Sequence, residues 1–172
     1  QARILDLCTG SGCIAIALAA MRPQAEVFGA DISEKALALA AKNARENGAA
    51  VTFAQCDLLK EEPQLPYPLF DLIISNPPYV KESERAEMEP NVLDYEPAIA
   101  LFVPDEEPLR FYRAIARYAA THLSENGLLV LEINENLGSE TCALLYEQGF
   151  DTQLQKDFRD KDRSIVATKK SC

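Results

Sequence analysis

Short apolar runs alternate along most of the chain with longer segments whose apolar residues recur at helical spacing. Runs rich in Ile, Leu and Val and bounded by turn residues are typical of buried strands in a parallel sheet. Strands are predicted at 3–7, 26–30, 51–54, 69–75, 128–133, 150–155 and 164–168. Helices are predicted at 13–21, between a cap at Ser33 and Asn47, at 109–123 and at 137–148. The alternation predicts a doubly wound α/β sheet, with an antiparallel hairpin at the end because only a short polar loop joins the last two strands.

One strand of this pattern, at 69–75, ends in the sequence Asn76-Pro77-Pro78-Tyr79. The proline rings hold Asn76 and Pro77 extended and form a stiff ledge at the carboxyl edge of the sheet, where open α/β folds bind ligands. The Asn76 side-chain oxygen and the Pro77 carbonyl can each accept a hydrogen bond from an –NH₂ group, and the Tyr79 ring offers a stacking face. A plain strand end with a proline turn is the structural alternative. The Asn and Tyr flanking the prolines favour a site for a planar NH₂ group.

The segment 81–108 lacks helical or strand periodicity. It is acidic and longer than an ordinary connection, which favours a lid or a binding loop. Within it, Glu96 is the residue expected to shape the wall of a substrate pocket, whereas the other charges equally fit a solvated loop. The segment contains four prolines, at Pro90, Pro97, Pro104 and Pro108.

Composition narrows the class of protein. The 172 residues fit one domain, with 48% hydrophobic and 26% charged residues. No apolar run approaches the roughly 20 residues of a membrane span, and a net charge of −10 argues against direct nucleic-acid binding. Five cysteines without C-x-x-C pairing and a single histidine, His122, predict no metal site and reduced thiols in a cytoplasmic protein. The start at Gln1, directly before a strand, leads us to expect a domain excised from a longer protein.

A glycine loop, Cys8-Thr9-Gly10-Ser11-Gly12, joins the first strand to the first helix. Such a loop lets the backbone approach a ligand closely above a helix N-terminus. The spacing Gly10-x-Gly12-x-x-Ala15, with Asp31 nineteen residues after Gly12, also satisfies the dinucleotide-binding fingerprint. The loop alone therefore leaves the cofactor open.

Acidic residues at strand ends favour S-adenosylmethionine as that cofactor. Asp6 suits the positively charged amino end of a methionine moiety and would repel a pyrophosphate, and Asp57 can accept a hydrogen bond from an adenine amino group. Asp31 can accept from both ribose hydroxyls. Strand-end capping is the structural alternative for Asp6 and Asp57 taken singly. The residues expected to contact the cofactor are Asp6, Cys8, Thr9, Gly10, Ser11, Gly12, Asp31, Ile32, Asp57, Leu58 and Asn76.

Several of these motifs resemble the HemK/PrmC class of protein-(glutamine-N5) methyltransferases. The Asn76–Tyr79 motif is shared with adenine- and cytosine-directed methyltransferases, and Tyr95-Glu96-Pro97 with Ala100-Leu101 narrows the resemblance to this class. The motifs that carry it are residues 6–12, Asp31, Asp57, 76–79, 95–97, 100–101 and Leu131-Glu132.

The resemblance implies a class I methyltransferase fold, Rossmann-like, with a seven-stranded, mostly parallel sheet in the order 3-2-1-4-5-7-6. It implies methyl transfer from S-adenosylmethionine, leaving S-adenosylhomocysteine, to the glutamine of the Gly-Gly-Gln motif in peptide chain release factors. Residues 1–172 would be the catalytic domain, without the N-terminal helical domain that helps such enzymes dock the release factor. Asn76, Pro77 and Tyr79 would be catalytic, and Asn76, Pro77, Pro78, Tyr79 and Glu96 would contact the substrate.

Some positions depart from the pattern of the class. Cys8 replaces the first loop glycine, which we expect to be tolerated only with a negative φ at that position. Glycines are also common or usual where this chain has Asp105, Pro108, Asn134 and Asp160.

Two other functions remain open at this point. An aminomethyltransferase acting on an exocyclic amine of adenine or cytosine in RNA or DNA would share every catalytic residue. A non-enzymatic cofactor-binding scaffold would keep the glycine loop alone, and the presence of both Asn76 and Tyr79 argues against it.

Overall fold

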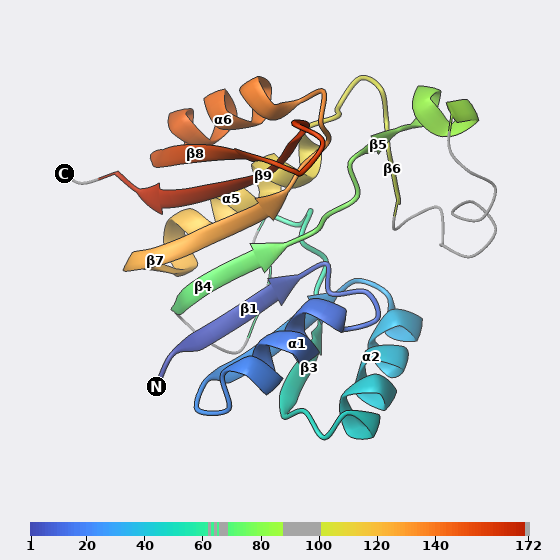
Figure 1. The fold of residues 1–172 in the computed structure, drawn as a ribbon, viewed down its shortest axis with the longest axis vertical. Helices are drawn as coiled ribbons and strands as arrows, with labels where there is room; N and C mark the ends of the chain where they lie inside the picture. Colours follow the sequence, from blue (N-terminus) through green and yellow to red (C-terminus); the bar gives the residue numbers. More distant parts are fainter. Residues whose placement is uncertain (62, 64, 66–68, 88–100, 171–172) are drawn as a thin grey trace.

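The sheet is the organising element of the fold, shown as a ribbon in Figure 1. The computed structural model describes residues 1–61, 63, 65, 69–87 and 101–170. Seven strands form the sheet in the order β3-β2-β1-β4-β7-β9-β8. Their bounds are β1 Arg3–Leu7, β2 Glu26–Asp31, β3 Val51–Gln55, β4 Phe70–Ser75, β7 Leu123–Glu132, β8 Phe150–Lys156 and β9 Asp162–Lys169. Strands β1, β2, β3, β4 and β7 pair in parallel, and β9 pairs antiparallel with β7 and β8.

The class I methyltransferase architecture and the final hairpin are confirmed, but the strand numbers differ from the expected 3-2-1-4-5-7-6. The expectation did not include β5 (Val80–Lys81) and β6 (Phe102–Val103), which lie between β4 and β7 in the chain and pair in parallel with each other as a separate small sheet. A 3-10 helix, η1 (Glu82–Glu87), follows β5 directly. Both strands and the 3-10 helix fall in the segment where the sequence showed no periodicity.

The helices cover both faces of the sheet. Helices α1 (Cys13–Met21) and α2 (Glu34–Glu46) lie on one side, and α5 (Arg110–His122) and α6 (Gly138–Glu147) on the other (Figure 1). The α5/α6 side holds the larger core, in which Ile115 and Leu145 are fully buried among side chains of the central strands. The α1 side holds a smaller cluster around Ala15, with Ile4 and Val27. The predicted Ser33 cap is confirmed, since its hydroxyl accepts the Ala36 N–H at 3.2 Å.

The strands are less uniformly buried than the apolar pattern predicts. In β7, Leu129 and Leu131 are fully buried on the α5/α6 side, whereas Leu128 is 42% exposed and Val130 is half-buried on the opposite side. The same alternation marks β4, where Ile73 is buried and Leu72 half-buried.

The predicted boundary between the helix 109–123 and the strand 128–133 is wrong. Helix α5 ends at His122, and β7 begins at Leu123, five residues earlier than expected. Leu123 pairs with Phe70, and Leu128 with Leu72, so a bulge in β7 absorbs Asn126-Gly127, which the sequence placed in a helix-ending turn.

No helix in the described part of the chain is long and apolar enough to cross a membrane. The parallel strands β1, β4 and β7 point the same way in Figure 1, and their carboxyl ends meet at one edge of the sheet. The glycine loop and the segment 76–79 both leave the sheet from this edge.

Candidate active site

The glycine loop contacts α2 on one side and is open at Gly10. Gly12 has φ +83 and caps α1, and a Cβ added there would lie 3.0 Å from the Cβ of Ala40 in α2. Asn43 of α2 donates from Nδ2 to the Ser11 carbonyl at 2.9 Å. Gly10 has φ +54, and a Cβ added there would meet no atom within 4 Å. The loop therefore presents open backbone to a ligand while α2 supports it.

The expectation that Cys8 keeps a negative φ is wrong, because the structure gives it φ +58. The chain must turn sharply at Cys8 so that the two amides after it, those of Thr9 and Gly10, can bond to β2. The Thr9 N–H donates to the Ala30 carbonyl at 3.0 Å, and the Gly10 N–H to Asp31 Oδ2 at 2.9 Å. A left-handed conformation costs a non-glycine residue about 1–2 kcal/mol. Burial also raises the pKa of the Cys8 thiol to about 12, which keeps it neutral.

Asp6 is almost fully buried at this edge, at 1% exposure. Its Oδ2 accepts hydrogen bonds from the Thr9 hydroxyl at 2.6 Å and the Ala15 N–H at 3.2 Å. Its Oδ1 is buried and has no hydrogen-bond partner. Burial raises the pKa of this carboxyl from 3.8 to about 6, although the bonds from Thr9 and Ala15 lower it. A buried carboxylate oxygen without a partner favours a cation or a strong donor beside it.

Asp31 ends β2, and Asp57 follows the end of β3 by two residues. Asp31 accepts the Gly10 N–H through Oδ2 and the Ser33 N–H through Oδ1, both at 2.9 Å, so it joins the glycine loop to the start of α2. Each of its oxygens retains a second lone pair for a ligand hydroxyl. Asp57 is half-buried, and its Oδ1 accepts the Leu59 N–H at 3.1 Å.

The two apolar residues predicted at the cofactor site differ in exposure. Ile32 is 45% exposed, beside Asp31, and can cover a flat ring. Leu58 is only 5% exposed and packs in the main core, so a ligand could reach its backbone but not its side chain. The predicted cofactor residues thus lie along one edge, at or just after the ends of β1, β2, β3 and β4.

The ledge is firmly seated. Pro77 and Pro78 are buried, whereas the Asn76 side chain is exposed. Ser75, just before it, donates from its hydroxyl to the Leu7 carbonyl at 2.7 Å and ties the end of β4 to the end of β1. Asn76 lines a cavity of about 160 Å³ together with Ile14, which lies in the first turn of α1. The ledge amide and the helix that follows the glycine loop therefore share one small cavity.

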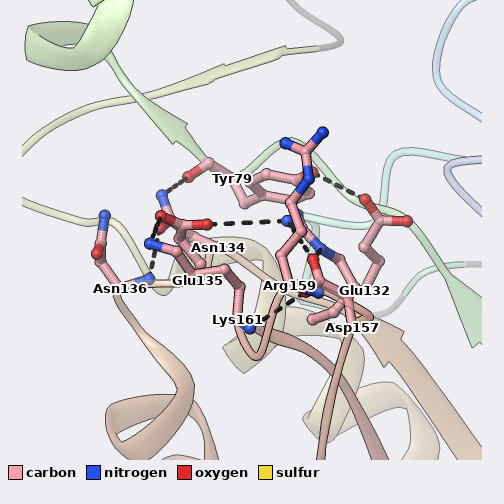
Figure 2. Close-up of polar contacts among 9 residues, drawn as sticks. Tyr79, Glu132, Asn134, Glu135, Asn136, Asp157, Arg159 and Lys161 are labelled. Carbon is pink, nitrogen blue, oxygen red and sulfur yellow. Dashed lines mark hydrogen bonds and ion pairs between the residues drawn. The ribbon is translucent and has the colours of Figure 1, made fainter.

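Tyr79 is half-buried, and its hydroxyl donates to Glu132 Oε1 at 2.8 Å (Figure 2). Burial raises the pKa of the Tyr79 phenol, and the Glu132 carboxylate raises it further, so the hydroxyl stays protonated. Glu132 also lines the cavity beside Asn76, as does Arg163. Arg163 is held in place by Asp157, whose Oδ2 accepts from its Nη2 at 3.1 Å and from its Nε at 3.3 Å.

Sequence reasoning did not predict Glu132 or Arg163 as site residues. Glu132 carries the signal that identified the other carboxylates, an acidic residue at the end of an apolar strand. Arg163 begins an antiparallel strand, and only the three-dimensional pairing of β9 with β7 brings it to this edge. Glu96 and the neighbouring residues 95–97 and 100 lie outside the described residues.

A second, larger hollow of about 860 Å³ lies at the amino edge of the sheet, lined by residues 1–2, 4 and 21–25. It contains none of the predicted site residues. Of the predicted site residues, Asn76 lines the smaller cavity at the carboxyl edge.

Comparisons with known proteins show which proteins the chain resembles. The chain is 50% identical over 164 residues to a protein of Flavobacterium psychrophilum named release factor glutamine methyltransferase, covering 95% of this chain and 57% of that protein. A protein of Bacteroides thetaiotaomicron with the same name is 48% identical, over 97% of this chain and 60% of its own length. The chain therefore spans less than two thirds of these relatives, and the resemblance to this class is confirmed.

Solved structures share the fold. The crystal structure of TrmN from Thermus thermophilus is 26% identical with a TM-score of 0.68, over 98% of this chain and 44% of that one. A family model described as Methyltransferase domain matches residues 1–159. The chain, with its glycine loop and its Asn-Pro-Pro-Tyr ledge at one sheet edge, belongs to the methyltransferase domain family.

Proposed function

We propose that this chain transfers a methyl group from S-adenosylmethionine to the side-chain amide nitrogen of the glutamine in the Gly-Gly-Gln motif of peptide chain release factors. One observation carries the proposal: the exposed amide of Asn76 lines the same small cavity as Ile14, directly after the glycine loop. Membership of the methyltransferase family and the names of the relatives support the reaction and the substrate. In this proposal residues 1–172 are the catalytic domain of a cytoplasmic enzyme of translation.

The residues of the carboxyl edge fit the proposed cofactor. The partnerless Oδ1 of Asp6 would accept from the ammonium of the methionine moiety. Asp31 would accept from the ribose hydroxyls, and the exposed Ile32 would cover the adenine, whose amino group Asp57 would bind. Open space above Gly10 lets the ligand lie against the loop backbone. When bound, S-adenosylmethionine supplies an electrophilic methyl group.

The ledge would orient the substrate. The Asn76 side-chain oxygen and the Pro77 carbonyl can each accept one N–H of the glutamine amide, which fixes the direction of its nitrogen. Tyr79, held by Glu132, provides a face for the planar amide. Orientation of this kind can supply a large share of a rate enhancement, because a bimolecular encounter becomes effectively unimolecular. No strong base is required, because the amide nitrogen can release a proton after the transfer.

The proposal excludes a nucleic-acid base as the principal substrate. The residues that would bind the amine are the same for both substrates, but the relatives are named for release factor glutamine and the chain carries a net charge of −10. An excess of acidic over basic residues disfavours binding to phosphates.

The test is incubation of the protein with methyl-labelled S-adenosylmethionine and a purified release factor. A second release factor with the motif glutamine replaced by alanine is the matched control, and an RNA and a DNA substrate complete the set. We expect label in the release factor alone, at the glutamine. Label in the alanine control or only in nucleic acid would refute the proposed substrate.

A further inference from the structure

A buried amide directly after β7 joins the sheet to the segment that follows the ledge. Asn134 is 6% exposed, and all of its polar groups have partners. Its Nδ2 donates to the Tyr79 carbonyl and to Glu84 Oε2, both at 3.1 Å. Its Oδ1 accepts the Asn136 N–H at 2.9 Å, and its own N–H donates to the Tyr112 hydroxyl at 3.2 Å. Figure 2 shows the Asn134 side chain pointing toward Tyr79.

The two N–H groups of this amide reach different parts of one segment. Tyr79 ends the ledge, and Glu84 lies in η1, five residues further along. Glu84 Oε2 also accepts the Lys81 N–H at 3.0 Å, so the same oxygen links η1 back to β5. Asn134 is more than 50 residues from Tyr79 in the chain and about as far from Glu84. One side chain therefore fixes the end of the ledge and the start of the next turn to the sheet.

A residue that only filled space at this position would not need an amide. Removing the amide would leave the Tyr79 carbonyl and the Glu84 carboxylate without this donor, and such groups then seek water or a new conformation. A glycine, usual at this position in the class that the sequence resembles, has no side chain and could make neither of these bonds.

We propose that Asn134 is a positioning residue for the protein substrate, which acts by holding Tyr79 and η1 against the carboxyl end of β7. The inference rests on the proposed function, because it assigns Tyr79 to the substrate side of the site. Asn134 does not line the cavity beside Asn76, and its hydrogen bonds among the described residues do not include the glycine loop. Its loss should change how the release factor is held and leave the cofactor side intact.

The kinetic test compares Asn134→Ala with Asn136→Ala. Asn136 is exposed two positions further on and contributes only its backbone N–H to this network, so its substitution is a matched control. For Asn134→Ala we expect kcat/KM for the release factor to fall roughly tenfold to a hundredfold, chiefly through KM, and the dissociation constant of S-adenosylmethionine to stay within twofold. A general loss of structure would instead weaken the binding of both the release factor and S-adenosylmethionine, or would lower only the fraction of active protein.

A charge exchange tests the Glu84 link separately. Asn134→Asp removes both donors and places a second carboxylate beside Glu84, so we expect a larger loss than with alanine. Adding Glu84→Gln supplies a new amide that can donate toward position 134 while its oxygen accepts the Lys81 N–H. The double variant should recover part of the loss. The Tyr79 carbonyl would still lack its donor, so full recovery is not expected.

Hydrogen exchange tests the anchoring without any turnover. We expect amides of residues 80–87 to exchange at least tenfold faster in Asn134→Ala than in the unsubstituted protein, with amides of β1 and β4 unchanged. Unchanged exchange in this segment, or unchanged kcat/KM in both Asn134 variants, would overturn the inference. If the unsubstituted protein fails to methylate the release factor, the proposed function falls, and the exchange result still decides whether Asn134 anchors the segment.

Discussion

Tyr79 and Glu132 are joined by a hydrogen bond of 2.8 Å between the phenol and Oε1, across 53 residues of sequence. The bond connects the last residue of the Asn-Pro-Pro-Tyr ledge to the last residue of the adjacent strand β7. Its consequence is that the tyrosine ring has a fixed orientation before any substrate arrives. The hydroxyl thus holds the ring, and in the proposed function the ring receives the amide.

Replacing this hydroxyl separates the two roles. Tyr79→Phe keeps the ring and loses the bond to Glu132, so we expect partial activity and a loss of about 1 kcal/mol in the free energy of unfolding. Tyr79→Ala removes the stacking face and should be far less active. Steady-state kinetics on the release factor and chemical denaturation measure both effects. A phenylalanine variant as inactive as the alanine variant would show that the hydroxyl itself takes part in the reaction.

Asp6 predicts a pH dependence of cofactor binding. Burial raises the pKa of its carboxyl to about 6 in the free protein, and a bound ammonium would favour the ionised form and lower that pKa. Binding therefore requires loss of a proton below pH 6 and none well above it. We expect affinity for S-adenosylmethionine to be constant above about pH 7 and to fall by up to tenfold per pH unit below 6.

Isothermal titration calorimetry between pH 5 and 8 measures this dependence, and Asp6→Asn is the control that should abolish it. Equal affinity for the unsubstituted protein across the whole range would show that Asp6 does not face the ammonium.

The left-handed backbone at Cys8 leads us to expect that glycine at this position stabilises the protein more than alanine does. Its φ of +58 is strained for any side chain, so Cys8→Gly relieves strain that Cys8→Ala retains. Both variants lose the thiol, which makes them a matched pair. We expect the glycine variant to be more stable than the alanine variant by about 1 kcal/mol in denaturant unfolding. Alanine at least as stable as glycine would contradict the left-handed conformation.

Asp31 should contribute strongly to cofactor affinity. Asp31→Ala removes the proposed ribose acceptor and the bonds to the Gly10 and Ser33 amides. We expect binding to weaken by about 1.5–3 kcal/mol, which is roughly ten- to a hundredfold. Calorimetry measures the change, and Asp71→Ala, a carboxylate at the opposite end of β4, serves as the control. Unchanged affinity would remove Asp31 from the cofactor site.

Most of the sheet could be predicted from the sequence because its signals are local. The strand at 3–7 and the helix at 13–21 have the bounds that the apolar pattern predicts, and Ser33 caps α2 as its position indicates. The boundary before β7 could not be predicted, because Asn126-Gly127 has the chemistry of a turn and only pairing with β4 places it in a bulged strand.

In the candidate site, too, some residues could be placed from local sequence signals and others could not. Asp6 lies inside the end of an apolar run and Asp31 and Asn76 at the ends of two others, so position in the chain was enough to bring them to one edge. Glu132 and Arg163 join them through pairings that span tens of residues. The positive φ of Cys8 also has a long-range cause, since the Ala30 carbonyl and the Asp31 carboxylate of β2 demand the turn.

The most direct test of the account is single-turnover methyl transfer by Asn76→Ala, with cofactor binding measured on the same preparation. Because Asn76 is exposed at the cavity, its truncation should leave the fold unchanged. Asn76 is only one of several predicted cofactor contacts, so the cofactor affinity should fall far less than the rate of transfer. We expect the rate of transfer to the release factor to fall by roughly a hundredfold or more. A variant that methylates at the unsubstituted rate would contradict the account.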